Sequence, residues 1–282
     1  MTPLLKQEQK QTRLEMKFAV NYSTPLKELI EQGEVKVDLL KCPDWEGIVN
    51  AARTIGKVYI HFDIALGAGN IHELNFALID HLLCTTETPH LNTHLSNHPS
   101  LDHDNRANRK ILLNRWKEDV AYLRSQLPDV KIIAENLPCH EQMPELKMAA
   151  DPAMIADFIE ESDLGLLLDL SHAQISAQLM KVDPKDYVRR LPLDRLAELH
   201  LTGIRMYGGF LTDHFELQPQ DWSLAEWVAE QIHEGAWSLP KIVAFEYGGV
   251  GDVFCWRTEP SALRAQVPRL YEMFGEYRKI ID

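Results

Sequence analysis

The sequence predicts an α/β protein of the (β/α)₈ TIM-barrel class, and three observations support this prediction. Eight short apolar runs alternate with longer amphipathic segments from about Met16 onward, which is the rhythm of parallel strands joined by helical crossovers. Runs such as Ile132–Ala134 and Gly165–Leu168 are apolar at consecutive positions, as expected for strands buried on both faces. The length of 282 residues suits one such barrel.

The expected strands follow one another along the chain with room for a helix after each. They are Lys17–Asn21, Val35–Leu40, Val58–Phe62, Leu91–Leu95, Val130–Glu135, Leu164–Leu170, Leu196–Leu201 and Ile242–Glu246.

Helix signals lie between these strands. Ser23, followed by Thr24-Pro25, and Asp151, followed by Pro152, are typical of helix starts, with a capping side chain and a proline in the first turn. A helix from about Asp44 to Ile55 is expected to end at Gly56. The polar stretch 98–115 is expected to form a loop that runs into a long helix. No linker rich in glycine, serine or proline divides the chain, so we expect a polar N-terminal extension, 1–15, and a single barrel domain, 16–282.

Composition limits the classes of function. Hydrophobic residues make up 45% of the chain and charged residues 25%, as in an ordinary globular protein, and the formal net charge is −13. This acidic balance argues against nucleic acid as a partner. The first residues lack the apolar core of a signal peptide, and no apolar run is long enough for a membrane span. The four cysteines form no CxxC pair, which indicates reduced thiols and a cytoplasmic location.

Ionisable side chains stand at the ends of six expected strands. Because the carboxyl ends of barrel strands converge on one site, we expect these side chains to meet in one pocket. They are His61, His94, Glu135, Asp169, His200 and Glu246.

Imidazole together with carboxylate is a donor set that suits iron, zinc and manganese. His172, Asp213 and His214, expected in loops, enlarge the set to nine, more than one divalent ion requires, which indicates two or three ions bridged by a carboxylate such as Glu135. Asn136 is expected to support this carboxylate or to bind substrate. The three-residue spacing from Asp169 to His172 brings both side chains to one side of a helical turn.

Each of these residues also has a purely structural interpretation. A lone histidine at a strand end is more often a satisfied structural residue, Asp169 suits a helix cap, and Glu246 suits a buried ion pair. These interpretations weaken when the six residues are taken together, because that many buried acids and imidazoles without a cation would carry a severe desolvation cost.

At these residues the chain resembles the xylose-isomerase-like TIM-barrel superfamily, and within it the multinuclear non-haem iron-dependent oxidative enzymes, which modify cysteines in ribosomal peptides. The stretches that carry the resemblance are His61–Gly67, Glu135–Pro138, Leu166–Asp169, Arg195–Gly203, Thr212–His214 and Trp222. The resemblance implies two or three iron ions and a peptide or small-molecule substrate, with a substrate-presenting partner protein as a further expectation.

Other functions remain open at this point. The Asp169-x-x-His172 spacing is similar to that of the endonuclease IV and sugar-epimerase branches. In a sugar isomerase or epimerase, one Mn, Mg or Co ion would suffice, Glu135 or Glu246 would move a proton next to a carbonyl, and Arg205 would bind a hydroxyl or phosphate. Hydrolysis of phosphodiesters at three zinc ions is the third possible function, because the negative net charge disfavours a nucleic-acid substrate. A barrel that binds a ligand without catalysing a reaction is the last.

Overall fold

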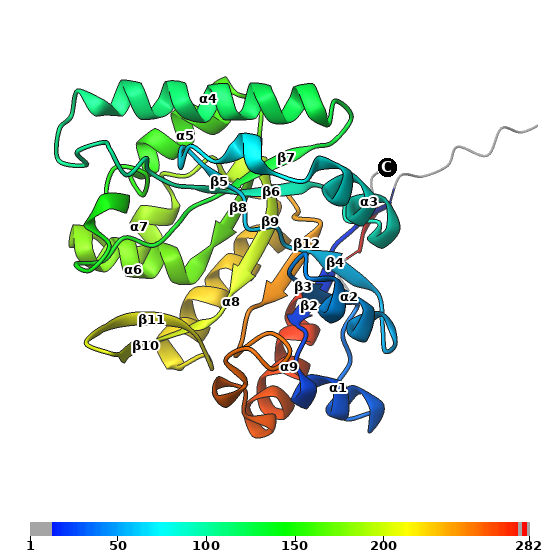
Figure 1. The fold of residues 1–282 in the computed structure, drawn as a ribbon. Helices are drawn as coiled ribbons and strands as arrows, with labels where there is room; N and C mark the ends of the chain where they lie inside the picture. Colours follow the sequence, from blue (N-terminus) through cyan, green and yellow to red (C-terminus); the bar gives the residue numbers. More distant parts are fainter. Residues whose placement is uncertain (1–12, 276–277, 281–282) are drawn as a thin grey trace, which may run out of the picture.

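The computed structural model describes residues 13–275 and 278–280 and shows a curled, nine-stranded sheet surrounded by helices (Figure 1). All neighbouring strands in this sheet are parallel, in the order β4-β3-β2-β12-β9-β8-β7-β6-β5. The two edge strands, β4 and β5, come from one short stretch of chain, so the sheet order returns to its start as in a barrel. The expected TIM-barrel fold is therefore confirmed. The strands of this sheet are β2 (Lys17–Asn21), β3 (Leu39–Cys42), β4 (Val58–Ile60), β5 (Ala65–Leu66), β6 (Leu91–Leu95), β7 (Ile132–Glu135), β8 (Gly165–Asp169), β9 (Leu196–Leu201) and β12 (Ile242–Phe245).

Helices cover the outside of the sheet, and two smaller strand pairs complete the fold. Strands β1 (Arg13–Glu15) and β13 (Arg278–Ile280) pair with each other, so the last three residues of the expected extension form a strand; residues 1–12 lie outside the described part. Strands β10 (Gly203–Tyr207) and β11 (Phe210–Phe215) form an antiparallel hairpin after β9. The helices are α1 (Thr24–Glu31), α2 (Glu46–Arg53), α3 (Phe76–Thr86), α4 (Asn108–Gln126), α5 (Pro152–Glu161), α6 (Leu170–Met180), α7 (Pro184–Val188), α8 (Pro219–His233) and α9 (Pro260–Phe274).

The helix starts expected from the sequence are confirmed. The Ser23 hydroxyl accepts a hydrogen bond from the Leu26 N–H, and the Asp151 carboxylate accepts one from the Ala153 N–H. Each bond satisfies a donor that the first turn of a helix leaves without a partner. Among the described residues, no helix has the length and apolar character needed to cross a membrane.

Five expected strands differ from the structure in their bounds, three of them by only one or two residues at an end and the second and third for reasons that the structure shows. The second runs over Leu39–Cys42 rather than Val35–Leu40, because Asp38 bonds Phe18 through both its backbone and its carboxylate before the ladder begins. The third breaks after Ile60 and resumes as β5. At the break, the Asn92 side chain accepts from the Phe62 N–H at 2.7 Å and donates to the Phe62 carbonyl at 2.9 Å, replacing the missing ladder bonds.

The barrel interior is layered because side chains along a strand alternate between its two faces. A small apolar cluster fills the lower layer, and polar or ionisable side chains two residues further along several of the same strands form the layer above it. On β2, β3 and β4, the lower residue is followed two positions later by Asn21, Lys41 and His61, respectively. The lower cluster consists of Ala19, Leu39, Tyr59, Ile242 and Ala244.

Candidate metal centre

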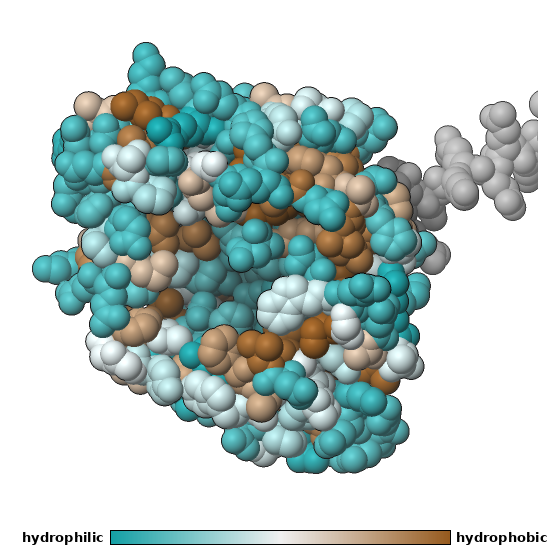
Figure 2. Space-filling view, viewed as in Figure 1, coloured by the Kyte–Doolittle hydropathy of each residue, from teal (hydrophilic) through white to brown (hydrophobic). Residues whose placement is uncertain are grey.

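The ionisable residues at the strand ends meet at the carboxyl end of the barrel. A cavity of about 250 Å³ opens there, and His61, His94, Glu135, His172 and Glu246 are among the residues that line it. The space-filling view shows a hydrophilic hollow in the middle of the visible face (Figure 2). The carboxyl ends of β9 and β12 point toward this region in the matching ribbon view (Figure 1).

Glu135 joins two histidines on one side of the cluster. Its Oε2 lies 3.2 Å from His94 Nε2 and 3.6 Å from His61 Nε2, and the two imidazole nitrogens are 3.1 Å apart. Donor atoms that share one ion at about 2.1 Å from it are separated by roughly 3.0–3.4 Å. The donor atoms of these three side chains are therefore separated by nearly the distances expected for ligands of one metal ion.

His172 lies on the other side of Glu135, with its ring held by two oxygens. Its Nδ1–H donates to the Asn136 carbonyl at 2.9 Å, and its Nε2 lies 3.0 Å from Asp213 Oδ2. A carbonyl oxygen only accepts, so Nδ1 carries a proton, and Nε2 donates to the Asp213 carboxylate in the metal-free protein. Burial alone would lower the pKa of His172, but the nearby carboxylates of Asp169 and Asp213 hold it well above its usual value. Nε2 is the nitrogen that could bind a metal after losing its proton. Glu135 Oε1 is 3.2 Å from His172 Nδ1, so the two Glu135 oxygens face different neighbours.

The two carboxylate oxygens of Asp169 have different roles, one as a helix cap and one as a candidate metal ligand. Its Oδ1 accepts from the His172 N–H at 2.8 Å and so caps α6. Its Oδ2 accepts no hydrogen bond from any described residue, and the side chain is fully buried. One oxygen therefore orders the helix start, and the other remains available to a cation.

His200 and Glu246 form the third part of the cluster. His200 Nδ1 is 3.2 Å from Glu246 Oε1 and 3.9 Å from Asp169 Oδ2. The buried ammonium of Lys41 forms an ion pair with Glu246. The sequence analysis did not single out Lys41, because a lysine beside an apolar run is usually a solvated flank; its position two residues after Leu39 on the inner face is the signal that could have found it.

Asp213 and His214 lie at the rim of the cluster, on strand β11 of the hairpin rather than in the loop expected from the sequence. Asp213 Oδ2 lies 4.0 Å from His214 Nε2. His214 has a positive φ of 62°, a backbone conformation that is rare for residues other than glycine and here turns its ring toward the cavity that it lines.

Buried polar atoms without hydrogen bonds test whether this donor set fits a metal. Burying such an atom without a partner costs free energy, so native proteins seldom do it. Within the described part of the chain, Glu135 Oε2, Asp169 Oδ2 and His200 Nδ1 are such atoms, and all three belong to this cluster. A cation placed among them would satisfy them.

The electrostatics agree with this fit. Burial raises the pKa of Asp169 to about 8, and the nearby carboxylates of Glu246 and Glu135 add to the rise while His172 opposes it. Burial alone would raise the pKa of Glu135, but His94 and His172 hold it well below its usual range. Burial and Lys41 keep the pKa of His61 well below its usual value. Asp169 thus lacks a compensating cation, and the His61 imidazole is kept neutral, the form that binds metals.

Two residues expected to bind substrate do not reach the cavity. Asn136 is fully buried, and its amide donates to the Asp169 carbonyl and accepts from the Asp169 N–H, so it holds the strand end rather than a substrate. Arg205 lies on the hairpin, where it pairs with Glu216 and stacks on Phe215. Neither residue lines the cavity, because the polar groups of both side chains are bonded to neighbouring parts of the chain.

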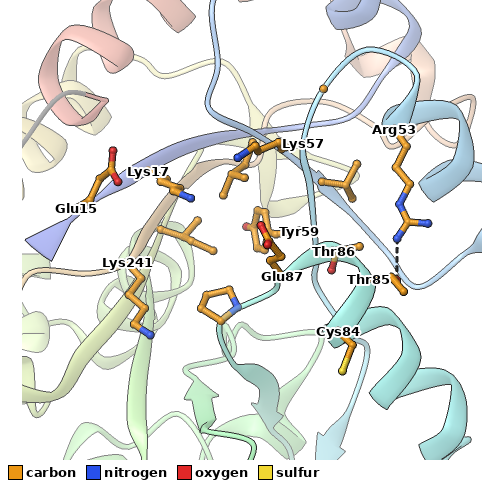
Figure 3. A pocket seen from close by; sticks show the side chains of 15 residues that line it. Glu15, Lys17, Arg53, Lys57, Tyr59, Cys84, Thr85, Thr86, Glu87 and Lys241 are labelled. Atoms are coloured by element: carbon orange, nitrogen blue, oxygen red, sulfur yellow. Dashed lines mark hydrogen bonds between the residues drawn. The ribbon is translucent and has the colours of Figure 1, made fainter. Parts of the chain in front are cut away.

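A second, larger cavity lies at the opposite end of the barrel (Figure 3). Lys17, Lys57, Lys241 and Arg53 surround it, with Tyr59 beside them. Among the described residues, none of the candidate metal-ligand groups includes a residue that lines this cavity. In barrels of this class the amino end of the strands serves stability, so size alone does not make this cavity the active site.

A family model described as "RiPP precursor modification enzyme MbnB/TglH/ChrH" matches residues 60–239. The chain belongs to this family. The matched range contains eight of the nine expected ligands and ends before Glu246. Family membership and the clusters of candidate ligands together place the chain among metal-dependent TIM-barrel enzymes.

Two curated relatives are UPF0276 proteins. One, from Acaryochloris marina, is 33% identical over 96 residues, which cover 33% of this chain and 34% of the relative. The other, from an Anaeromyxobacter species, is 22% identical over 148 residues, or 52% of this chain and 40% of the relative. The chain therefore spans about a third to two fifths of the length of these relatives.

Solved structures show the same fold at low sequence identity. A xylose isomerase domain-containing protein from Salmonella typhimurium superposes with a TM-score of 0.57 and 13% identity, covering 92% of this chain and 97% of that one. A D-psicose 3-epimerase superposes with a TM-score of 0.55 and 11% identity, covering 91% and 97%. These similarities confirm the TIM-barrel fold.

Proposed function

We propose that this protein is an oxidative enzyme with two or three iron ions that modifies a peptide substrate. The observation that carries the proposal is the overlap of the ligand groups. Glu135 belongs both to the group with His61 and His94 and to the group with Asp169 and His172. Asp169 belongs in turn to a further group with His200 and Glu246. Shared carboxylates are what a cluster of several ions requires, whereas a single ion would leave most of these donors unused.

The ligand assignment follows from this overlap. The inner ligands are proposed to be His61, His94, Glu135, Asp169, His200 and Glu246, with His172, Asp213 and His214 at the rim. Iron at these residues would supply redox chemistry with dioxygen as the oxidant. Histidine and carboxylate donors suit iron, although they also suit zinc and manganese, and the family description supplies the peptide substrate.

The chain's own residues have distinct parts in this proposal. Glu246 lines the cavity and pairs with Lys41. Burial alone would raise the pKa of Glu246, but His200 and Lys41 hold it well below its usual range, so the carboxylate stays ionised and can accept a proton from a bound substrate. Glu135 is the proposed bridging carboxylate, because its two oxygens face different groups. The buried apolar layer beneath excludes water from the lower side of the site.

Metal analysis of protein purified without oxygen tests the proposal. We expect two or three irons per chain and a Mössbauer spectrum of coupled or inequivalent sites. His94→Ala should lower the iron content by about one ion, whereas His81→Ala, at an exposed position on α3, should not change it. One manganese, magnesium or cobalt ion per chain would refute the proposal in favour of a sugar isomerase or epimerase, and three zinc ions would favour hydrolysis.

A further inference from the structure

Glu198 is a buried carboxylate that the sequence analysis did not single out. It lies on β9 two residues before His200, so both side chains point into the barrel. Only 1% of Glu198 is exposed. Its Oε1 accepts from the Tyr59 hydroxyl at 3.1 Å and from His200 Nε2–H at 2.7 Å, and its Oε2 contacts His90 Nε2. Three donors therefore converge on one carboxylate beneath the cluster.

The two nitrogens of His200 have different surroundings. Nε2 is held by Glu198, whereas Nδ1 makes no hydrogen bond to any described residue and faces Glu246 and Asp169. A carboxylate can only accept from Nε2, so that nitrogen carries a proton. When a metal approaches, the lone pair on Nδ1 is then the one directed at it.

We propose that Glu198 is a positioning residue that fixes the ring orientation and tautomer of His200 so that Nδ1 can bind a metal ion. The inference rests on the proposed metal centre. Carboxylates that hold the second nitrogen of a metal-binding imidazole orient the ring and make it a stronger ligand. Tyr59 and His90 hold the carboxylate in turn, and Tyr59 reaches it from the lower layer of the barrel.

A competing role for Glu198 is that of a metal ligand itself. Ligand atoms of Glu198, His61 and His200 lie within 4.8 Å of one another, so distance alone would permit this. Two observations oppose it. Both Glu198 oxygens are already engaged with donors from three side chains, and Glu198 is not among the residues that line the cavity. Direct coordination would break this network, whereas positioning uses it as it stands.

Zinc binding to chelator-stripped protein separates these roles. Isothermal titration with Zn²⁺ compares the wild type with Glu198→Ala, Glu198→Gln and Tyr59→Phe, each checked for folding by circular dichroism. Glu198→Ala should weaken binding of one ion about 10–100-fold. Glu198→Gln keeps an oxygen that can accept from His200 and should restore most of the affinity. Tyr59→Phe removes a different hydrogen bond from the same oxygen and should have a smaller effect.

Nitrogen NMR of histidine-labelled, zinc-loaded protein gives a second readout. In the wild type, His200 should show a proton on Nε2 and a coordinated Nδ1, and this pattern should be lost in Glu198→Ala while His61 and His94 keep theirs. Unchanged affinity and an unchanged His200 tautomer in Glu198→Ala would overturn the inference. Loss of one ion in both Glu198 variants would overturn it in favour of a direct ligand. A wild type that binds no Zn²⁺ would instead refute the metal centre, and the inference with it.

Discussion

Replacing Asp169 with asparagine should stabilise the metal-free protein and abolish much of its response to metal. The substitution keeps the shape of the side chain and an oxygen for the His172 N–H, since asparagine caps helices about as well as aspartate. It removes the charge on Oδ2, the buried oxygen that has no hydrogen bond among the described residues. The wild-type carboxylate is therefore expected to cost stability until a cation binds.

The pKa of Asp169 sets the size and the sign of this effect. Its folded-state pKa is raised to about 8, against about 3.9 in an unfolded chain. At pH 7 the unfolded chain ionises this carboxyl while the folded chain largely keeps it protonated, and this difference lowers the stability of the wild type by roughly 4 kcal/mol. The new amide also needs partners when buried, at about 1–3 kcal/mol, so we expect a net gain of about 2 kcal/mol. Because the folded pKa is raised, the gain should be small near pH 4, grow up to about pH 8 and stay constant above it.

Urea unfolding of chelator-treated protein at pH 5, 7 and 8, with and without added metal, measures this effect. Metal at a hundred times its dissociation constant should stabilise the wild type by about 2.7 kcal/mol and Asp169→Asn by much less. Asp183→Asn is the matched control, because Asp183 caps α7 at an exposed position. This substitution should change neither the stability of the metal-free protein nor its stabilisation by metal. A gain for Asp169→Asn that does not vary with pH, or an undiminished response to metal, would refute the reasoning.

Three further predictions concern other parts of the molecule. Lys41→Met should destabilise the metal-free protein by about 3–5 kcal/mol in urea unfolding, because Glu246 would be left as an uncompensated buried charge; a smaller loss in the metal-loaded form would agree with this cause, and equal losses would not. Trp116→Ala should cost about 3–5 kcal/mol, because the ring is fully buried against Phe158; a calorimetric Tm within 2 °C of the wild type would contradict this. Mass spectrometry after iodoacetamide treatment at pH 8 should find two modified thiols, since burial raises the pKa of the other two to about 12 and about 11; labelling of all four in the native state would be the contrary result. The thiols expected to react are Cys84 and Cys255, and those expected to be protected are Cys42 and Cys139.

Local sequence patterns were enough to predict much of the barrel. The strands Lys17–Asn21, Leu91–Leu95 and Leu196–Leu201 have the expected bounds, because an apolar run followed by a polar residue marks a buried parallel strand. The caps at Ser23 and Asp151 were visible because capping depends on neighbours within a few residues. The break after Ile60 was not visible, because it depends on the Asn92 side chain from another strand.

The sequence alone determined which ionisable residues end the strands, and barrel geometry then indicated that they meet. Only the tertiary structure decided how each one is used. It directed one oxygen of Asp169 to the α6 cap and left the other without a partner. It also buried Lys41 against Glu246 and turned Arg205 away to the hairpin. The physical reason is that hydrogen bonds and ion pairs depend on distances of a few ångströms between residues far apart in the chain, which strand periodicity cannot specify.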